Sequence, residues 1–141
     1  MIKTKDIKMV SDAFEYARKN KNNKTYTIVA FLVDGKRVVS IGKNDYKKTH
    51  AKTPQIKEYV IPAHAEVKCI SKYLIKNRIV KNDLTLYVVG LTQGKVANPV
   101  ISSKPCESCS KFISTVGIRR VVYCENSDKL TIKEWMVQDE I

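Results

Sequence analysis

Apolar positions in the N-terminal third of the chain predict one helix followed by a hairpin. Apolar residues recur at helical spacing across residues 11–19 and just upstream of them, which is typical of an amphipathic helix. β-branched and aromatic residues dominate residues 25–33, and a second run of this kind covers residues 37–41. Asp34-Gly35 separates the two runs and favours a tight turn. The sequence therefore predicts a helix and a two-stranded hairpin.

The second half of the chain alternates expected helices and strands. Residues 63–76 predict a helix with Val67 and Ile70 toward the core, and the uninterrupted apolar run 84–91 predicts a buried strand. Pro105 suits the first turn of a third helix, and Gly117 suits its end. A strand over 119–124 and a helix over 131–137 complete the series. This order predicts an α/β layered structure in which right-handed crossovers join the later, parallel strands.

No repeat, low-complexity tract or linker divides the chain, so we expect one domain over residues 1–141. Residues 45–62 are polar and without clear periodicity, and an irregular segment of this length in a small domain is more often functional than idle. Turn signals at Gly94 and Asn98-Pro99 predict a further hairpin over residues 92–103.

Two short motifs carry most of the chemistry. His64 and Glu66 stand at the expected start of one helix, and Cys106 and Cys109 stand at the start of the next. Because these helices flank one strand, their N-termini can meet beyond the same edge of the sheet. One imidazole and two thiolates then give three ligands to zinc, which leaves its fourth position to water in catalytic sites. The positive helix ends are expected to lower the pKa values of the thiols.

Glu66 lies two residues from His64, a spacing that directs its carboxylate into the same pocket without making it a ligand. It is then free to accept a proton from zinc-activated water and to return protons to the substrate. The expected reaction is hydrolytic, since hydroxide attacks a carbon that bears an exocyclic amine and ammonia leaves. Backbone groups near Ala65 and at the start of the Cys106 helix are expected to hold the base.

His-x-Glu followed by Pro-Cys-x-x-Cys is the signature of zinc-dependent nucleobase deaminases. On His64-Ala65-Glu66 and residues 105–109, and on the order of elements over residues 25–124, the chain resembles the cytidine and deoxycytidylate deaminase superfamily. The resemblance implies a three-layer α/β/α domain with a mixed sheet of roughly five strands. It also implies one Zn²⁺ per chain, no organic cofactor and a homo-oligomer. Residues 117–123 resemble the deoxycytidylate and tRNA-adenosine branch, and residues 42–50 resemble small phage-type deoxycytidylate deaminases.

Substrate contacts are expected outside the zinc motifs as well. Asn44, at the end of the second expected strand, matches the position where many family members use an asparagine to hold the sugar or base. Lys48 and the other lysines of residues 45–62 border the sugar side and offer ammonium groups to a phosphate. Tyr123 has two interpretations, stacking on a base and packing in the core. Because His64 and Cys106 are further apart than in compact relatives, we expect residues 92–103 to absorb the extra length.

The cysteines leave other interpretations open. The Cys-x-x-Cys pair could be a redox motif, but redox motifs lack an accompanying His-x-Glu at another helix start. A closed structural zinc site needs a fourth protein ligand, for which His50 and Cys69 are the candidates. Cys69 is more consistent with a small core residue because it lies five residues into the helix from His64. Cys124, at a strand end, is expected to be a buried thiol.

The net charge is +12, from 26 Lys and Arg residues against 14 Asp and Glu residues. Such an excess favours a polyanionic partner, yet the surplus is mostly lysine scattered among many Asn and Ile residues, as an AT-rich coding sequence also gives. The longest apolar runs are strand-sized, and the Lys-rich start lacks an apolar signal core. We therefore expect no membrane association and a cytoplasmic protein, one that acts in a host cytoplasm if it is phage-encoded.

These features predict zinc-dependent hydrolytic deamination of a cytosine-containing pyrimidine nucleotide similar to dCMP, which gives the uracil form and ammonia. Deamination of cytosine or adenine in single-stranded DNA or tRNA is the alternative, and the positive charge supports it. Nucleoside substrates and a non-enzymatic zinc module are the remaining alternatives.

Overall fold

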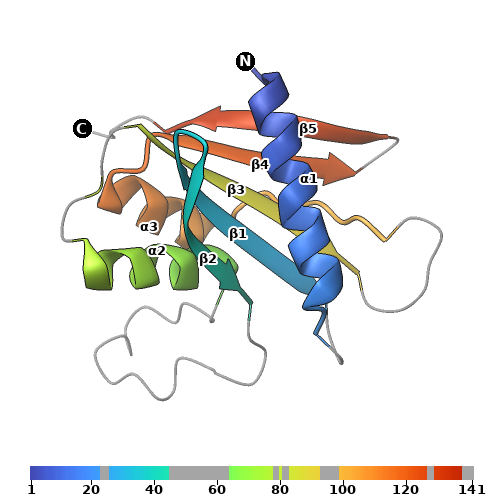
Figure 1. Ribbon diagram of the computed structural model, residues 1–141, viewed down its shortest axis with the longest axis horizontal. Coiled ribbons are helices and arrows are strands. Elements are labelled where there is room, and N and C mark those ends of the chain that lie inside the picture. Colours follow the sequence, from blue (N-terminus) through green and yellow to red (C-terminus); the bar gives the residue numbers. More distant parts are fainter. Residues whose placement is uncertain are drawn as a thin grey trace.

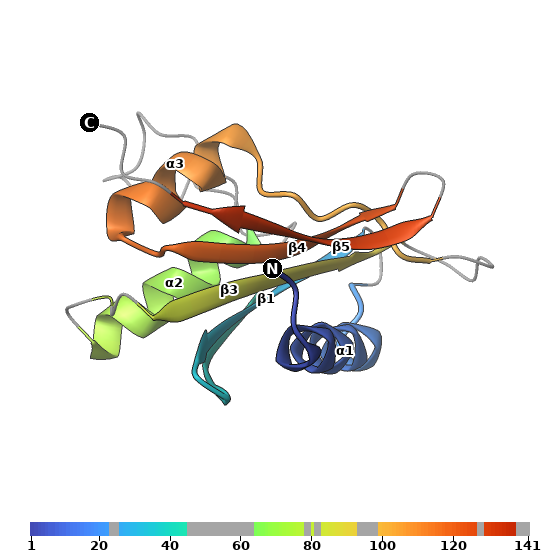
Figure 2. The same ribbon diagram turned by 90° about the horizontal axis from the view of Figure 1, so that it is seen from above.

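The computed structural model describes residues 1–22, 26–44, 64–77, 80, 83–92, 99–126 and 129–137. The described part contains a five-stranded sheet with helices on both faces (Figure 1). α1 (Thr4–Lys19) covers one face, while α2 (Ala65–Lys76) and α3 (Glu107–Val116) cover the other, as Figure 2 shows. The expected three-layer α/β/α arrangement is confirmed. No described helix is long and apolar enough to cross a membrane.

The sheet is mixed, as expected, and its strands lie in the order β2-β1-β3-β4-β5. These strands are β1 (Thr27–Asp34), β2 (Arg37–Lys43), β3 (Leu84–Leu91), β4 (Arg120–Asn126) and β5 (Leu130–Met136). β1 is antiparallel to β2 and β3, β4 is antiparallel to β5, and β3 is parallel to β4. Because Thr27 pairs with Leu91, the start of β1 and the end of β3 share one edge of the sheet. This edge carries the functional residues described below.

The hairpin and the buried strand form where the sequence predicts them. Gly35 closes the β1–β2 turn with φ of 65°, a left-handed conformation that glycine adopts without the Cβ clash of other residues. Every residue of β3 is buried. Alternate β3 side chains pack on opposite faces of the sheet, with Leu86 and Val88 toward α2 and α3, and Tyr87 and Val89 toward α1. Two covered faces explain why the β3 sequence is apolar throughout.

The helix expected over residues 131–137 is wrong, because this segment is β5. Ile132 packs with the cluster under α1, whereas Trp135 packs with the cluster under α2 and α3. Residues three apart lie on one side of a helix but on opposite faces of a strand. The spacing of these two apolar residues therefore fitted a helix, although it serves a strand that contributes to both cores.

Smaller differences concern the ends and faces of helices. The third helix begins at Glu107 rather than at Pro105, because Cys106 is its N-cap and its sulfur accepts a hydrogen bond from the Cys109 amide. The helix ends as expected at Gly117, whose φ is 92°. In α2, Ile70 is buried as expected, but Val67 is only half-buried. α1 begins at Thr4, earlier than the pattern over residues 11–19 indicates.

Close packing of α2 on β2 fixes the position of the first turn of α2. A Cβ atom on Gly42 would lie 2.3 Å from the Ala65 carbonyl oxygen and 2.5 Å from the Cys69 amide nitrogen. The Ser40 hydroxyl donates to the Cys69 carbonyl at 2.6 Å, and the Cys69 thiol donates to the Ser40 carbonyl at 3.3 Å. Cys69 is fully buried in this contact, which confirms it as a core residue.

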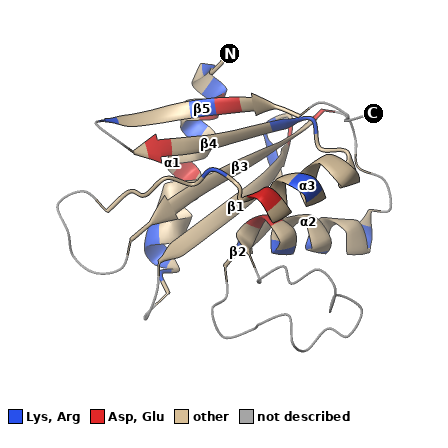
Figure 3. Cartoon of the chain, turned by 180° about the vertical axis from the view of Figure 1, so that it is seen from behind, with Lys and Arg blue, Asp and Glu red and all other residues tan. Residues whose placement is uncertain are grey.

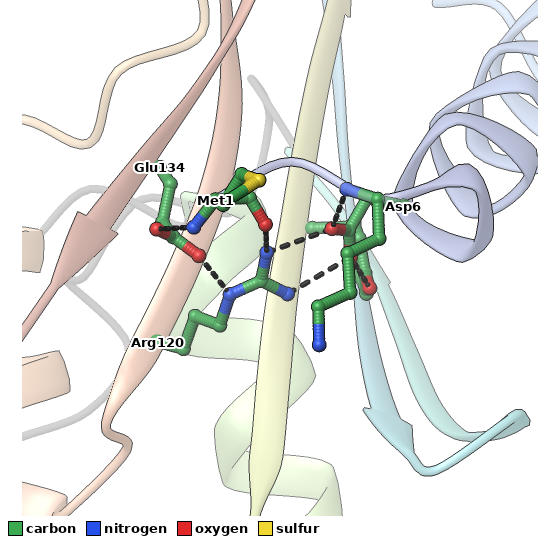
Figure 4. Close-up of polar contacts among 6 residues, drawn as sticks. Met1, Asp6, Arg120 and Glu134 are labelled. Atoms are coloured by element: carbon green, nitrogen blue, oxygen red, sulfur yellow. Dashed lines mark hydrogen bonds and ion pairs between the residues drawn. The ribbon is translucent and has the colours of Figure 1, made fainter.

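On the face of the sheet that α1 covers, opposite α2 and α3, a buried charge network joins α1 to β3 and β4 (Figure 4). Asp6 is fully buried, and its carboxylate accepts two hydrogen bonds from the Arg120 guanidinium at 2.7 and 2.8 Å and one from the Tyr87 hydroxyl at 2.5 Å. Arg120 also contacts Glu134 of β5. Burial alone would raise the pKa of Asp6, but the hydrogen bonds to its carboxylate outweigh burial and hold the pKa well below its usual range.

Candidate active site

Three potential metal ligands converge at the edge of the sheet where β1 begins and β3 ends. His64 is the N-cap of α2, Cys106 is the N-cap of α3, and Cys109 lies in the first turn of α3. The Nδ1 atom of His64 lies 3.1 Å from Sγ of Cys109 and 3.5 Å from Sγ of Cys106. All three donor atoms lie within 4.8 Å of one another. The convergence of two helix starts beyond one sheet edge is therefore confirmed.

The spacing of these atoms fits a tetrahedral zinc ion. Zinc binds histidine nitrogen at about 2.0–2.1 Å and thiolate sulfur at about 2.3 Å, so tetrahedral angles place such donors about 3.6 Å apart. The observed nitrogen–sulfur distances of 3.1 and 3.5 Å are close to this value. Among the described histidine, cysteine and acidic residues, His64, Cys106 and Cys109 form the group whose donor atoms lie close enough to share a metal ion. A catalytic site with one open position follows from three protein ligands.

Burial shifts the pKa values of the imidazole and of the buried thiol in opposite directions. Burial lowers the pKa of His64, which keeps its imidazole neutral and able to bind a metal. Burial raises the pKa of the Cys109 thiol far above its usual range, and the neighbouring Glu66 and Cys106 raise it further. Burial, the largest cause of this shift, thus opposes the lowering of the pKa that the helix end is expected to give. A bound cation removes this penalty by pairing with the thiolate.

Glu66 lies one residue into α2 and is 5% exposed. Burial raises the pKa of its carboxyl group, while hydrogen bonds from its own backbone amide and from the Cys109 thiol lower it in part. The acidic first turns of α2 and α3 are neighbours in Figure 3. A carboxylate next to the metal ligands, yet not among them, is positioned to accept and return protons.

A pocket of about 280 Å³ opens in front of these residues, close to the lower limit for small-molecule sites. His64, Ala65, Glu66 and Cys106 line its metal side. The remaining described lining residues come from the start of β1, the end of β2 and the segment before α3: Tyr26, Ile28, Asn44, Ile101, Ser102, Ser103 and Lys104. The pocket therefore combines the candidate metal ligands with a wall that contains both apolar or aromatic and polar side chains.

Ser103 ties the segment that carries Cys106 to two strands. Its hydroxyl donates to the Val88 carbonyl at 2.7 Å and accepts from the Cys124 amide at 3.0 Å. Its own amide donates to the Cys124 carbonyl at 2.9 Å. Ser103 is 4% exposed, so these bonds are shielded from water. The register of the segment on β3 and β4, and with it the place of Cys106, depends on these contacts.

Asn44 lines the pocket, but its side chain also holds the sheet edge together. Its Oδ1 atom accepts from the Ile28 amide at 2.8 Å and from the Asn22 side chain at 3.0 Å. Its Nδ2 atom donates to the Tyr26 carbonyl at 3.1 Å. Among the described residues, the side-chain amide of Asn44 donates one hydrogen bond, so its second amide hydrogen is the one that could contact a substrate.

The other expected site residues fall in different places. Ala65 is fully buried and lines the pocket. Tyr123 is 7% exposed and packs in the core under α2 and α3, and it is not among the described residues that line the pocket. Cys124 is a fully buried thiol, as expected, and burial raises its pKa to about 11. Lys48 and His50 lie outside the described residues.

Sequence reasoning missed several residues of the pocket wall. Tyr26 is 49% exposed at the pocket, and Ile28 follows it on β1. Their proximity to His64 arises from strand pairing, which leaves no local signal. Ser103 did carry a local signal in the sequence, because it is a small polar residue three positions before Cys106. The expected return of residues 92–103 along β3 is supported at its base, where Leu91 bridges to Val100.

A family model described as the cytidine and deoxycytidylate deaminase zinc-binding region matches residues 3–125. The chain belongs to the cytidine and deoxycytidylate deaminase family. It is therefore a zinc-dependent deaminase, and His64, Cys106 and Cys109 are the described residues that could hold its zinc. At the level that the family supports, its reaction is deamination of cytosine.

Solved structures of two deaminases share the fold of this deaminase. A cytidine deaminase from Burkholderia pseudomallei is 18% identical over 89% of this chain and 90% of its own, with a TM-score of 0.54. The apo form of the dCMP deaminase from cyanophage S-TIM5 is 20% identical over 86% of this chain and 82% of its own, with a TM-score of 0.52. At these identities the likeness concerns the fold alone. No curated protein matches the sequence closely enough to count as a relative.

Proposed function

We propose that this deaminase converts a cytosine-containing nucleotide of the dCMP type to its uracil form, with Glu66 as the proton shuttle. The observation that carries the proposal is the buried Glu66 carboxylate in the same pocket as His64 and Cys106. The cytidine and deoxycytidylate deaminase family and the fold shared with a cyanophage dCMP deaminase support a pyrimidine nucleotide as substrate.

The chain's own residues have separate tasks in this reaction. Zinc, held by His64, Cys106 and Cys109, supplies a Lewis acid that activates water for attack on the carbon bearing the amine. Glu66 accepts one proton of that water and delivers it to the ring nitrogen. It then accepts the second proton from the same oxygen, now bonded to the base, and delivers it to the departing amine. The water oxygen becomes the carbonyl oxygen of the product, and the exocyclic nitrogen of the base leaves as ammonia.

The pocket wall orients the base for these proton transfers. Tyr26 offers an aromatic face, and stacking of a base on an aromatic side chain contributes about 1–3 kcal/mol. The remaining amide hydrogen of Asn44 is available to a sugar or base oxygen. Backbone groups around Ala65 and at the start of α3 are the remaining polar contacts to the base.

A polynucleotide substrate is the second candidate, because a net charge of +12 favours binding to a phosphate backbone. For both the nucleotide and the polynucleotide substrate, we propose that Lys48 and the other lysines of residues 45–62 contact phosphate. A cytoplasmic location, a phage origin, a homo-oligomer and a single domain over residues 1–141 are further parts of the proposal that come from the sequence.

Ammonia release tests the proposal directly. The zinc-loaded protein is incubated with cytosine, cytidine, dCMP, dCTP, 5-substituted dCMP and short cytosine- or adenine-containing oligonucleotides. We expect the highest kcat/KM with dCMP or a closely related nucleotide. Preference for an oligonucleotide would replace the nucleotide proposal with the polynucleotide one, and no ammonia from any of these compounds would refute both.

A further inference from the structure

A second hollow, of about 340 Å³, lies beside the active-site pocket and shares Asn44 with it. Its other described lining residues come from the end of α1, the end of β2 and α2: Tyr16, Asn22, Ile41, Lys43, Lys68 and Lys72. Three of them are lysines, and none of the residues described in this lining is acidic. The hollow is therefore a concentration of positive charge next to the pocket.

Two of the lysines are held in place by backbone carbonyl groups. Lys43 Nζ donates to the Asn20 carbonyl at 3.0 Å, and Lys72 Nζ donates to the Ile41 carbonyl at 3.1 Å. An ammonium group has three hydrogens, so each retains donors for an anion. These contacts order the charged ends before a ligand binds, which reduces the entropy lost on binding.

Helix stability does not account for this arrangement of charge. Lys68 and Lys72 are four residues apart on α2, and like charges at this spacing destabilise a helix by about 0.2–0.5 kcal/mol. Basic segments recur along α2 in Figure 3. An anion in the hollow would offset this repulsion.

The hollow also lies at a suitable position relative to the reacting base. A helix rises about 1.5 Å per residue, so Lys68 and Lys72 lie roughly 6 and 12 Å along the axis of α2 from His64. Asn44 forms the shared wall, and the Asn22 side chain on the other side donates to its Oδ1 atom at 3.0 Å. A base at Glu66 therefore leaves its sugar near Asn44 and its phosphate near the lysines.

We propose that this hollow, formed by Lys43, Lys68 and Lys72 with Asn22 and Tyr16, is a phosphate subsite of the deaminase. It binds the phosphate attached to the sugar of the deaminated nucleoside. This assignment rests on the proposed function, since it presupposes that the base enters the neighbouring pocket. The phosphate has two possible sources, the 5′-monophosphate of a nucleotide and a phosphodiester of a single strand.

Equilibrium binding of reaction products tests the subsite without turnover. The zinc-loaded wild type and a Lys68→Gln/Lys72→Gln variant are titrated with dUMP, with deoxyuridine and with a short oligonucleotide that contains one deoxyuridine. Lys36→Gln is the control, because it removes the same charge from the exposed turn at the opposite end of the β1–β2 hairpin. Far-UV circular dichroism and zinc content check that each variant is folded.

The result expected for a nucleotide is a loss of about tenfold in the affinity ratio of dUMP to deoxyuridine, as for lost hydrogen bonds to a charged group. For a strand, the loss falls on the oligonucleotide, and the salt dependence of its binding decreases by about one ion per phosphate contact removed. Either result supports the subsite, and each identifies its source of phosphate. The subsite would be overturned if the affinities for dUMP and for the oligonucleotide, each relative to deoxyuridine, were equal in the wild type, the double variant and Lys36→Gln.

Inorganic pyrophosphate separates this inference from the proposed function. In ¹⁵N-labelled protein we expect it to shift the amide resonances of Lys43, Lys68 and Lys72, but not that of Lys36. This shift does not depend on deamination, so a negative ammonia screen with a positive pyrophosphate result would refute the function and leave an anion site. Absence of the shift, together with unchanged affinities of the double variant for dUMP and for the oligonucleotide, would refute the subsite while the ammonia screen still tests the function.

Discussion

Nδ1 of His64 lies 3.1 Å from Sγ of Cys109, although the two residues are 45 positions apart in the sequence. The contact joins the first turns of α2 and α3, which approach from the same face of the sheet. Each helix depends on the other to complete the zinc site, so metal binding and the packing of the two helices are coupled.

The first prediction concerns this metal site. Purified protein should contain about one zinc per chain, as expected for a three-ligand site. Cys106→Ser and Cys109→Ser should lose zinc and activity together, because serine is a poor replacement for thiolate. Elemental analysis and ammonia release are measured on the same samples. Cys124→Ser is the matched control, since that thiol is buried away from the pocket. Active protein without zinc would contradict the assignment.

The second prediction separates metal binding from proton transfer. Glu66→Gln has nearly the same size as the wild-type side chain but cannot accept the proton of water. We expect zinc content and product binding to stay within a few-fold of wild type, while kcat falls by at least roughly 10²–10⁴-fold. Glu107→Gln, an exposed change in the first turn of α3, should retain wild-type kcat. Turnover at the wild-type rate by Glu66→Gln would exclude this residue as the shuttle.

The third prediction tests how β2 positions the zinc site. Gly42→Ala would place a Cβ atom 2.3 Å from the Ala65 carbonyl oxygen, and backbone cannot rotate away as a side chain can. We expect α2 to shift, at a cost of about 1–3 kcal/mol in the free energy of unfolding, with weaker zinc binding through His64. Urea unfolding and competition with a zinc chelator measure the two effects.

Gly35→Ala is the comparison for Gly42→Ala. Its Cβ meets nothing within 4 Å, but its φ of 65° costs about 1–2 kcal/mol for alanine. The free energy of unfolding should therefore fall while zinc affinity stays unchanged. Equal losses of zinc affinity in both variants would show that general destabilisation, and not the β2–α2 contact, controls the site.

Local sequence patterns identified much of this fold because they arise from local causes. The apolar run of β3 follows from burial on both faces, and the Asp34-Gly35 turn follows from backbone geometry. His64, Glu66, Cys106 and Cys109 were found because their spacing reflects two helix starts. The zinc site is thus largely contained in two short motifs.

Features that depend on pairing between distant segments were not visible in the sequence. Asp6 and Arg120 are 114 positions apart, and nothing near either residue indicates the other. β5 was mistaken for a helix because Ile132 and Trp135 serve opposite faces of the sheet. The basic hollow likewise combines α1, β2 and α2, so its lysines appear scattered in the sequence although they share one place in the fold.

The fourth prediction concerns Ser103 as a positioning residue. Ser103→Ala removes the acceptor of the Cys124 amide and the donor to the Val88 carbonyl, both buried, at a cost of about 1–3 kcal/mol. The segment leading to Cys106 should then loosen and zinc affinity should fall. Ser102→Ala is the control, because Ser102 is exposed and water can replace its contact with the Asn126 amide. Chelator competition that finds equal zinc affinity in wild type and Ser103→Ala would remove Ser103 from this role.

The fifth prediction uses the pH dependence of Asp6. Because the pKa of this carboxyl is held far below its unfolded value of about 3.9, the unfolded state binds its proton first as the pH falls. The stability that Asp6 contributes is therefore complete above the unfolded pKa and is lost progressively as the pH falls toward the folded pKa. The relevant window opens near pH 5 and extends downward.

Asp6→Asn should thus destabilise the protein most at neutral pH. Removal of one partner of a buried ion pair costs about 3–5 kcal/mol, and here Arg120 loses its buried carboxylate while it keeps Glu134. We expect the difference in unfolding free energy between wild type and Asp6→Asn to be about 3 kcal/mol at pH 7 and to shrink between pH 5 and pH 3. The difference between the two proteins is compared at each pH because zinc loss in acid affects both. Asp12→Asn is the control on the same helix. It should change the unfolding free energy only slightly, because the ion pair of Asp12 with Lys8 is exposed. A constant difference for Asp6→Asn across this range would mean that its charge does not stabilise the contact between α1 and β4.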